Sequence, residues 1–168
     1  MIDTCAFDTI YHEHHCYFSV TALVALFNRH GLKVTDVAWI DIHGGSLHVQ
    51  VRHHGGQAGA HRMMMDEEGL GVIRDEYYSE FAGRVRTLKQ RLIETMSMFE
   101  WVAGYGAAAK GVVLLNHFAL GIDCVPWVAD VSPHKQGRFL PGTRQPVVSP
   151  QKLLDDRPPA TLLLPWNI

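Results

Sequence analysis

The alternation of apolar and polar residues predicts a helix near the start of the chain. Apolar side chains recur at helical spacing from Val20 to Phe27, which is the pattern of a helix with one buried face. Ser19 stands directly before this run and is a good N-cap, while Gly31 follows it as a natural C′ residue. The helix is therefore expected to begin after Ser19 and to end before Gly31.

Two strands are expected after this helix. Residues 34–42 form a strand-like run, and residues 47–51 alternate between apolar and polar side chains with period two. The residues between these runs, His43-Gly44-Gly45-Ser46, have the composition of a hairpin turn. The pattern predicts an antiparallel pair, followed by a glycine-rich linker at residues 55–59.

The second half of the chain alternates between strand and helix patterns. A long amphipathic helix is predicted over residues 77–98, because apolar side chains fall on one stripe of it. The elements expected after it are a strand at 101–103, a glycine-rich turn at 104–111, a helix to about residue 120, strands at 125–131, 147–148 and 161–164, and a short helix at 150–155. This order is typical of βαβ units, so the sequence predicts an α/β fold with a mostly parallel sheet.

Composition narrows the class of protein. The 168 residues carry a formal net charge of −2 and no basic stripe, which argues against nucleic acid as a partner. The longest apolar runs are far too short to cross a bilayer, and acidic residues interrupt the first residues where a signal peptide would be apolar. Three cysteines without C-x-x-C spacing favour reduced thiols. We therefore expect a cytoplasmic protein that has no membrane partner.

The strongest chemical signal is the run Tyr11-His12-Glu13-His14-His15. Histidine titrates near pH ~6.5 and glutamate near ~4.3, so either side chain is suited to proton transfer after modest burial. A solvated histidine-rich loop is the alternative, because the chain has 11 histidines. A zinc site is a weaker alternative, since His12-Glu13 begins like H-E-x-x-H but Cys16 stands where the second histidine belongs. No metal site is predicted.

A second candidate site is the turn at residues 104–109, which satisfies G-x-G-x-x-A between a predicted strand and a predicted helix. Glycine permits a tight turn and a close backbone approach, which leaves helix N–H groups aimed at an anion. Asp130 ends the next strand about where a ribose-binding acid would stand. Positive charge for a diphosphate is available at Lys110, His134, Lys135, Arg138 and Arg144. The alternatives are a plain strand-to-helix bend and a solvated basic loop.

Five motifs follow one another along the chain. They are residues 7–14 (Phe-Asp-Thr-Ile-Tyr-His-Glu-His), 17–19 (Tyr-Phe-Ser), 43–47 (His-Gly-Gly-Ser-Leu), 104–111 (Gly-Tyr-Gly-Ala-Ala-Ala-Lys-Gly) and 135–143 (Lys-Gln-Gly-Arg-Phe-Leu-Pro-Gly-Thr). In these motifs and their order the chain resembles the S-adenosylmethionine-dependent C-methyltransferases that act on nucleotide-activated keto-deoxysugars. The resemblance covers essentially the whole chain.

The resemblance implies an α/β architecture in three parts. Residues 1–56 correspond to the last strands and helix of a class I methyltransferase domain, residues 57–98 to a linker and long connecting helix, and residues 99–168 to a Rossmann-like domain that binds a nucleotide sugar. Family members carry zinc-binding cysteines and a glycine-rich donor loop ahead of the matching region, and this sequence has neither. The chain is therefore expected to be a C-terminal portion that is inactive alone, with a homodimer or a missing N-terminal half as its partner.

The resemblance also implies site residues. His14 is the expected general base, with Tyr11 and Glu13 positioning the substrate and the imidazole, and with His43 near the same site. The residues expected to hold the nucleotide diphosphate sugar are Gly104, Gly106, Lys110, Asn116, Lys135 and Arg138. The implied cofactor is S-adenosylmethionine, whose binding loop is not among these motifs. A nucleotide-binding module without catalysis is the main alternative, and a metal-dependent hydrolase is the third.

A C-terminal portion should be less protected near its own N-terminus. A strand is expected ahead of Tyr11, and the apolar faces of the hairpin at residues 34–51 are expected to lack the larger sheet that would cover them. Hydrogen exchange should then be fast over residues 1–56 and slow after residue 101, unless a dimer covers the open edge.

Overall fold

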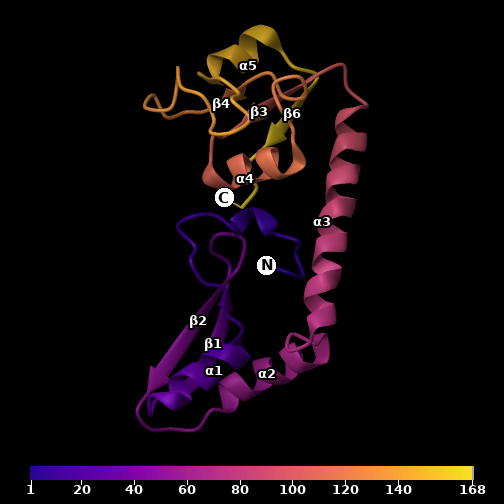
Figure 1. The fold of residues 1–168 in the computed structure, drawn as a ribbon. Coiled ribbons are helices and arrows are strands. Elements are labelled where there is room, and N and C mark those ends of the chain that lie inside the picture. The colour runs from indigo at the N-terminus through magenta and orange to yellow at the C-terminus, as the bar shows by residue number, and fades with distance from the viewer. Residues whose placement is uncertain (168) are drawn as a thin grey trace. The chain divides into compact units, whose positions relative to one another are not determined.

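The computed structural model describes residues 1–167, and these residues form two compact units. The first, called the sheet unit below, combines Met1–His15 with Gly83–Trp166. The second, the hairpin unit, comprises Cys16–Ala82 and Asn167. Figure 1 shows the ribbon of both units and labels most of their elements. The three-part division at residues 56 and 98 stays a prediction.

The hairpin unit contains the predicted helix and the predicted antiparallel pair. The elements are helix α1 (Val20–Arg29), strand β1 (Lys33–Ile40) and strand β2 (Ser46–Arg52). Ser19 caps α1, since its Oγ accepts a hydrogen bond from the backbone N–H of Ala22 at 3.0 Å. Gly31 takes the left-handed conformation after the helix, with φ +70°. The start and stop signals of this helix are therefore confirmed.

Helix α2, Ala58–Leu70, is an element that the sequence analysis missed. It begins inside residues 55–59, so the prediction of a linker is wrong for the second half of that stretch. No side chain caps its first turn, and two glycines lie within it, so its own helix signal is weak. Packing supplies the missing stability, because α2 contacts α1 and β1 and its Ala60 is completely buried.

A β-bulge aligns the apolar residues of the hairpin on one face. Val34 pairs with Val51 and Val37 pairs with Val49, and the register shifts between these pairs. The extra residue on β1 lets Val34 and Val37 face the same side, where Leu47 also packs. The expectation that these faces lack a cover is wrong, because α1 and α2 pack against them.

The sheet unit is built on four parallel strands in the order β5-β4-β3-β6. Its elements are β3 (Val102–Tyr105), α4 (Ala109–Phe118), β4 (Val128–Ala129), β5 (Val147–Val148), α5 (Gln151–Asp156) and β6 (Ala160–Leu163). Figure 1 shows α4 and α5 on opposite sides of this sheet, as right-handed crossovers that run in opposite directions require. The prediction of an α/β fold with a parallel, Rossmann-like sheet is confirmed.

The long helix differs from its prediction in position, and the strand predicted at residues 125–131 differs in length. The long helix is α3, Asp75–Met96, which is shifted slightly toward the N-terminus. The strand predicted at residues 125–131 is reduced to Val128–Ala129. Pro126 lies in the part that is not strand, and proline has no N–H to donate to a ladder.

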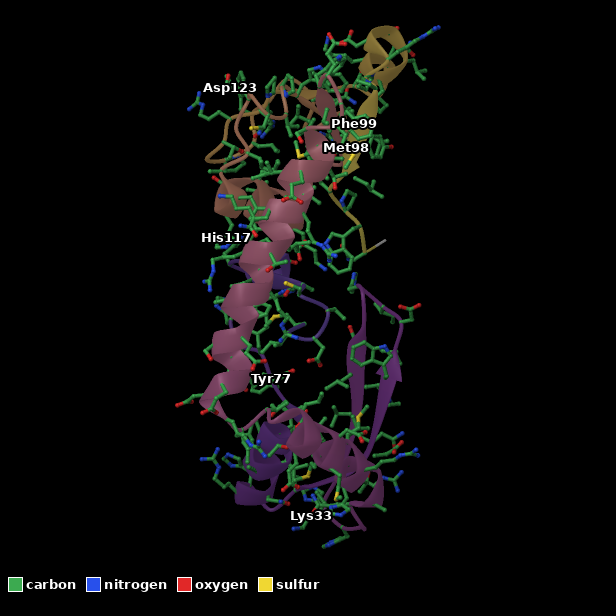
Figure 2. The ribbon with its side chains drawn as sticks, turned by 90° about the vertical axis from the view of Figure 1, so that its right-hand side faces the viewer. Lys33, Tyr77, Met98, Phe99, His117 and Asp123 are labelled. Carbon is green, nitrogen blue, oxygen red and sulfur yellow. The ribbon has the colours of Figure 1, made fainter. Side chains whose placement is uncertain are left out.

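Phe7–Thr9 form a short 3₁₀-helix, η1. Residues 1–10 contain no strand, so the prediction of a strand there is wrong. Phe7 is only 6% exposed and packs on α4, with its ring centroid 5.1 Å from that of His117 and 5.0 Å from that of Phe118. Figure 2 labels His117 on this helix. An isolated turn with one buried aromatic anchor satisfies its backbone locally and needs no strand partner.

Candidate active site

The histidine-rich motif forms a turn directly after η1. The backbone N–H of His14 donates to the carbonyl of Tyr11 at 2.9 Å, which closes the turn. The side chains of Tyr11 and His14 are also in contact, with ring centroids 4.3 Å apart and an interplanar angle of 41°. The structure therefore brings Tyr11 and His14 together, as a shared site requires. We call residues 11–14 the Tyr11–His14 turn.

A hydrogen bond fixes the protonation pattern of the His14 ring. Its Nδ1 lies 2.8 Å from the carbonyl oxygen of Thr9. A carbonyl oxygen only accepts hydrogen bonds, so Nδ1 must be the nitrogen that carries the proton. In the neutral ring the lone pair is then on Nε2. This is the arrangement of an imidazole that accepts a proton through Nε2.

Glu13 and His43 are placed differently from His14. The Glu13 carboxylate is 69% exposed and its Oε1 lies 3.9 Å from Nε2 of His12, so Glu13 lies beside the other histidine of the motif. His43 stands between β1 and β2 with φ +55° and belongs to the hairpin unit. Its place near the Tyr11–His14 turn stays a prediction.

The glycine turn after β3 is shaped by packing. A Cβ at Gly104 would stand 2.8 Å from Cγ2 of the buried Val128, so a larger residue there would displace the Val128 side chain. Gly106 has φ +87°, and a Cβ there would overlap the ring of Pro165. Both glycines are therefore required by the fold, whether or not a ligand approaches them.

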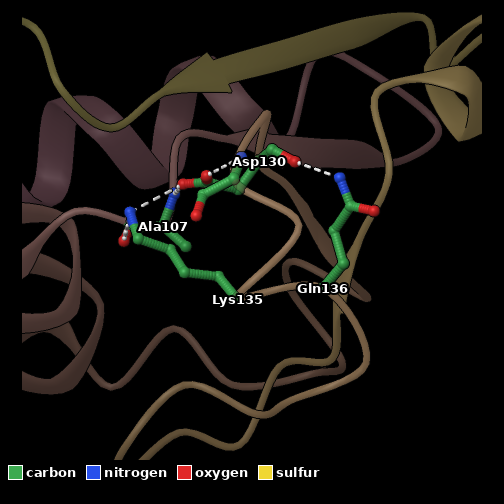
Figure 3. A network of polar contacts seen from close by, with 5 residues as sticks. Ala107, Asp130, Lys135 and Gln136 are labelled. Atoms are coloured by element: carbon green, nitrogen blue, oxygen red, sulfur yellow. Dashed lines mark hydrogen bonds and ion pairs between the residues drawn. The ribbon is translucent and has the colours of Figure 1, made fainter.

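Asp130 fills the position next to this turn, as Figure 3 shows. Its Oδ2 accepts hydrogen bonds from the backbone N–H of Ala107 at 2.7 Å and from Nζ of Lys135 at 3.0 Å. Its Oδ1 accepts from the backbone N–H of Ser132 at 2.8 Å. The amide of Gln136 donates to the Asp130 carbonyl at 2.9 Å. The acid expected to bind ribose thus joins two loops of the protein.

These contacts set the ionisation of Asp130. Burial raises the pKa of the carboxyl, but the hydrogen bonds from Ser132, Lys135 and Ala107 and the positive charge of Lys135 outweigh burial and hold the pKa below its ordinary value. The same ion pair engages Lys135, whose Nζ also donates to the Ala107 carbonyl at 2.9 Å. Lys135 therefore connects the loop at Ala107 to the loop at Asp130.

Three other residues were predicted to contact the nucleotide, and they occupy different settings. Lys110 is buried at 8% exposure, with Nζ 5.0 Å from the ring centroid of Trp166. The amide of Asn116 donates to the carbonyls of Val112 at 2.8 Å and Pro141 at 2.9 Å, which ties α4 to the loop beyond it. Arg138 is exposed. Of the two cationic residues, Arg138 is exposed and Lys110 is buried.

The structure also shows residues that the sequence analysis did not single out. Thr9 holds His14 through its carbonyl, and Asp8 accepts a hydrogen bond from Nε1 of Trp166 at 2.6 Å. Asp8 is 2% exposed. The available signal was the position of Asp8 and Thr9 inside the motif of residues 7–14, next to the candidate base.

The described residues contain neither a metal-ligand cluster nor a membrane-spanning helix. Among residues 1–167, no three His, Cys, Asp or Glu side chains are grouped as a metal site would need. Within that part of the chain, no helix combines the length and apolar character of a membrane span.

Residues 41–168 match the family described as the C-methyltransferase C-terminal domain, and the chain belongs to this family. It is also similar to the C-methyltransferase NovU of Streptomyces niveus, with 39% identity over 169 residues. That similarity spans 96% of this chain and 40% of NovU. The expected family, and the match to a portion of the longer relative, are confirmed.

Proposed function

We propose that this chain takes part in the S-adenosylmethionine-dependent methylation of a carbon in a nucleotide-linked keto-deoxysugar, with His14 as the base that forms the enolate. The observation that carries the proposal is the His14 ring, whose Nδ1 is hydrogen-bonded to Thr9 at 2.8 Å beside the Tyr11 ring. Membership in a C-methyltransferase family and the similarity to NovU support the reaction class.

The chemistry explains why a histidine is needed. A sugar carbon becomes acidic only beside a ketone, so a base must remove its proton while donors stabilise the developing enolate oxygen. Nε2 of His14 takes the proton, and the C–H electron pair moves into the enolate. The Tyr11 hydroxyl, on the same turn, is proposed as a donor to the enolate oxygen, and Glu13 is proposed to position the sugar. His43 is proposed to lie near the same substrate.

S-adenosylmethionine supplies an electrophilic methyl group when it is bound. The glycine turn of this chain does not fit that donor, because Asp130 takes the N–H of Ala107 and Pro165 covers Gly106. No residue of this chain is therefore assigned to the donor. The chain spans 40% of the length of NovU. The complete methyl-transfer reaction is therefore part of what is proposed.

The nucleotide diphosphate is proposed to approach the loop at residues 135–143. Arg138 makes the direct contact, because its side chain is exposed. Lys135 and Asn116 hold the loop through the contacts described above, while Gly104, Gly106 and Lys110 shape the turn and helix beside it. The proposed protein partner is either a second copy of this chain or an N-terminal part that carries the donor site.

The test of catalysis uses the chain fused behind the donor-binding part of a homologous C-methyltransferase. Transfer of a labelled methyl group from S-adenosylmethionine to a thymidine diphosphate keto-sugar is measured. His14→Ala should lower kcat by about 10²–10⁴-fold, as expected for loss of a general base, while sugar nucleotide binding stays nearly intact. If His14→Ala kept most of the activity and Glu13→Gln did not, the assignment of the base would be wrong.

The test of binding uses calorimetry of the chain with the same sugar nucleotide, with and without S-adenosylmethionine. Arg138→Ala should weaken binding, and the loss should be larger at low salt, because added ions screen a charge-assisted contact. Arg157→Ala is the matched control, since Arg157 is exposed after α5. Equal affinity of both variants at low ionic strength would remove Arg138 from the site. Binding without methyl transfer in the fusion would favour a nucleotide-binding module.

A further inference from the structure

The contacts around η1 identify a residue that holds the proposed base in place. We infer that Trp166 is a positioning residue for His14, acting through Asp8 and the η1 turn. The inference rests on the proposed function, in which His14 is the base. All of its contacts lie within the sheet unit.

The first contact joins the two ends of the described chain. Nε1 of Trp166 donates to Oδ2 of Asp8 at 2.6 Å, across 158 positions of sequence. Asp8 is 2% exposed, and a carboxylate taken out of water is costly unless donors satisfy it. A hydrogen bond to an ionised acceptor is also stronger than one between neutral groups. The indole N–H is therefore a substantial part of what holds Asp8 in its buried position.

The second contact orients the indole itself. Nζ of Lys110 lies 5.0 Å from the ring centroid of Trp166, within the range of a cation–π interaction. Lys110 belongs to the first turn of α4 and is buried. Since the ring is held over its face by Lys110 and at its N–H by Asp8, Trp166 links α4 to η1 with a defined orientation.

The third contact carries this orientation to the base. Asp8 is the middle residue of η1, and the carbonyl of the next residue, Thr9, accepts from the backbone N–H of Tyr11 at 3.1 Å and from Nδ1 of His14 at 2.8 Å. The Thr9 hydroxyl donates to the Ala6 carbonyl at 2.9 Å. A displacement of Asp8 therefore moves the carbonyl that selects the His14 tautomer.

The experiment measures the ¹⁵N resonances of the histidine rings in the 168-residue chain, without donor or sugar. The His14 signals are assigned by their loss in His14→Gln. In the native chain Nδ1 should be the protonated nitrogen at neutral pH. Trp166→Phe keeps an aromatic ring over Lys110 but removes the donor to Asp8, so protonation should shift from Nδ1 toward Nε2. Trp101→Phe is the control, because Trp101 packs on Trp127 in the same unit and should leave His14 unchanged.

Each outcome decides the inference. Unchanged His14 signals in a folded Trp166→Phe chain would overturn it and leave Trp166 as a packing residue only. If that variant does not fold, Asp8→Asn, whose amide oxygen still accepts from the indole, is compared with Asp8→Leu, which cannot accept. The Nδ1 signal should stay protonated in the first and lose protonation in the second, and equal signals in both would overturn the inference. Failure of the proposed function would instead appear as methyl transfer that survives His14→Ala.

Discussion

At the scale of single residues, Asp130 supplies the acceptor for a backbone N–H group of the loop after β3. In a phosphate-binding turn the backbone N–H groups ahead of the helix point at ligand oxygens. Here the carboxylate of Asp130 supplies those oxygens to Ala107 and Ser132, and Lys135 neutralises the charge. An internal anion thus takes the place of an external one at Ala107, and the loop is complete before any substrate arrives.

Asp130→Asn should destabilise the sheet unit. The variant keeps the shape but loses the ion pair with Lys135 and replaces an ionised acceptor with a neutral one, which costs about 1.5–3 kcal/mol per charged hydrogen bond removed. Denaturant unfolding at neutral pH measures the difference. Asp123→Asn is the control, because Asp123 is exposed, and its effect should be within about 0.5 kcal/mol.

The cost of Asp130→Asn should also depend on pH. The pKa of Asp130 is lowered in the folded chain, so its contribution to stability is fully present above the ordinary aspartate pKa of ~3.9 and is lost as pH falls through the lowered folded value. The stability difference between native chain and variant should therefore be constant near neutral pH and shrink in acid. A difference that grew below pH ~3.9 would contradict this account.

The sequence predicted an acid at the end of β4 but not its partner. Spacing alone places Asp130 beside a glycine turn, and both a ribose hydroxyl and the N–H of Ala107 are suitable donors for it. The choice depends on how loops that are 23 residues apart fold back, which no local pattern records. The motif of residues 7–14 marked His14 as a candidate, because the residues of the motif are adjacent in sequence. Trp166 was missed, because it contacts this motif across 158 positions of sequence.

At the scale of elements, a helix or strand was predictable where its own sequence carries the start, stop or turn residues. An element that depends on packing against its neighbours was not predictable. Helix α1 has a side-chain cap at Ser19 and a glycine after its end, and its bounds were predicted closely. Helix α2 has no such cap and is stabilised by contacts with α1 and β1. The β1–β2 pair was predicted from its turn residues, but the bulge beyond Val34 depends on the match to the helices that cover it.

Gly106→Ala should be more destabilising than Gly137→Ala. Both residues have positive φ, +87° and +78°, which costs an L-residue roughly 1–2 kcal/mol. At Gly106 the new Cβ would also overlap Pro165, which adds about 1–3 kcal/mol of overpacking, whereas nothing lies within 4 Å of a Cβ at Gly137. Thermal unfolding of both variants tests the difference. Equal losses would show that Pro165 yields and that the turn is less constrained than described.

At the scale of the whole molecule, the division into units cuts across the order of the sequence. Residues 1–15 belong with residues 83–166, although residues 16–82 separate them along the chain. Periodicity identified the α/β class and its parallel sheet, because that information lies in successive segments. It could not show that η1 packs on α4, since the ring contacts of one buried phenylalanine, Phe7, carry that packing. The structure, and not the order of the family motifs, places His14 in the same unit as the glycine turn.

Phe7→Ala tests this division directly. Removing a buried phenylalanine costs about 3–5 kcal/mol, and the loss should fall on the sheet unit because Phe7 packs on His117 and Phe118. Hydrogen exchange should become faster in α4 and in residues 1–15 while α1, β1 and β2 keep their native rates. Phe99→Ala, at a residue 40% exposed in the same unit, should cost no more than about 1 kcal/mol. If Phe7→Ala accelerated exchange equally in both units, the first 15 residues would not belong to the sheet unit alone, and the path from Trp166 to His14 would lose its support.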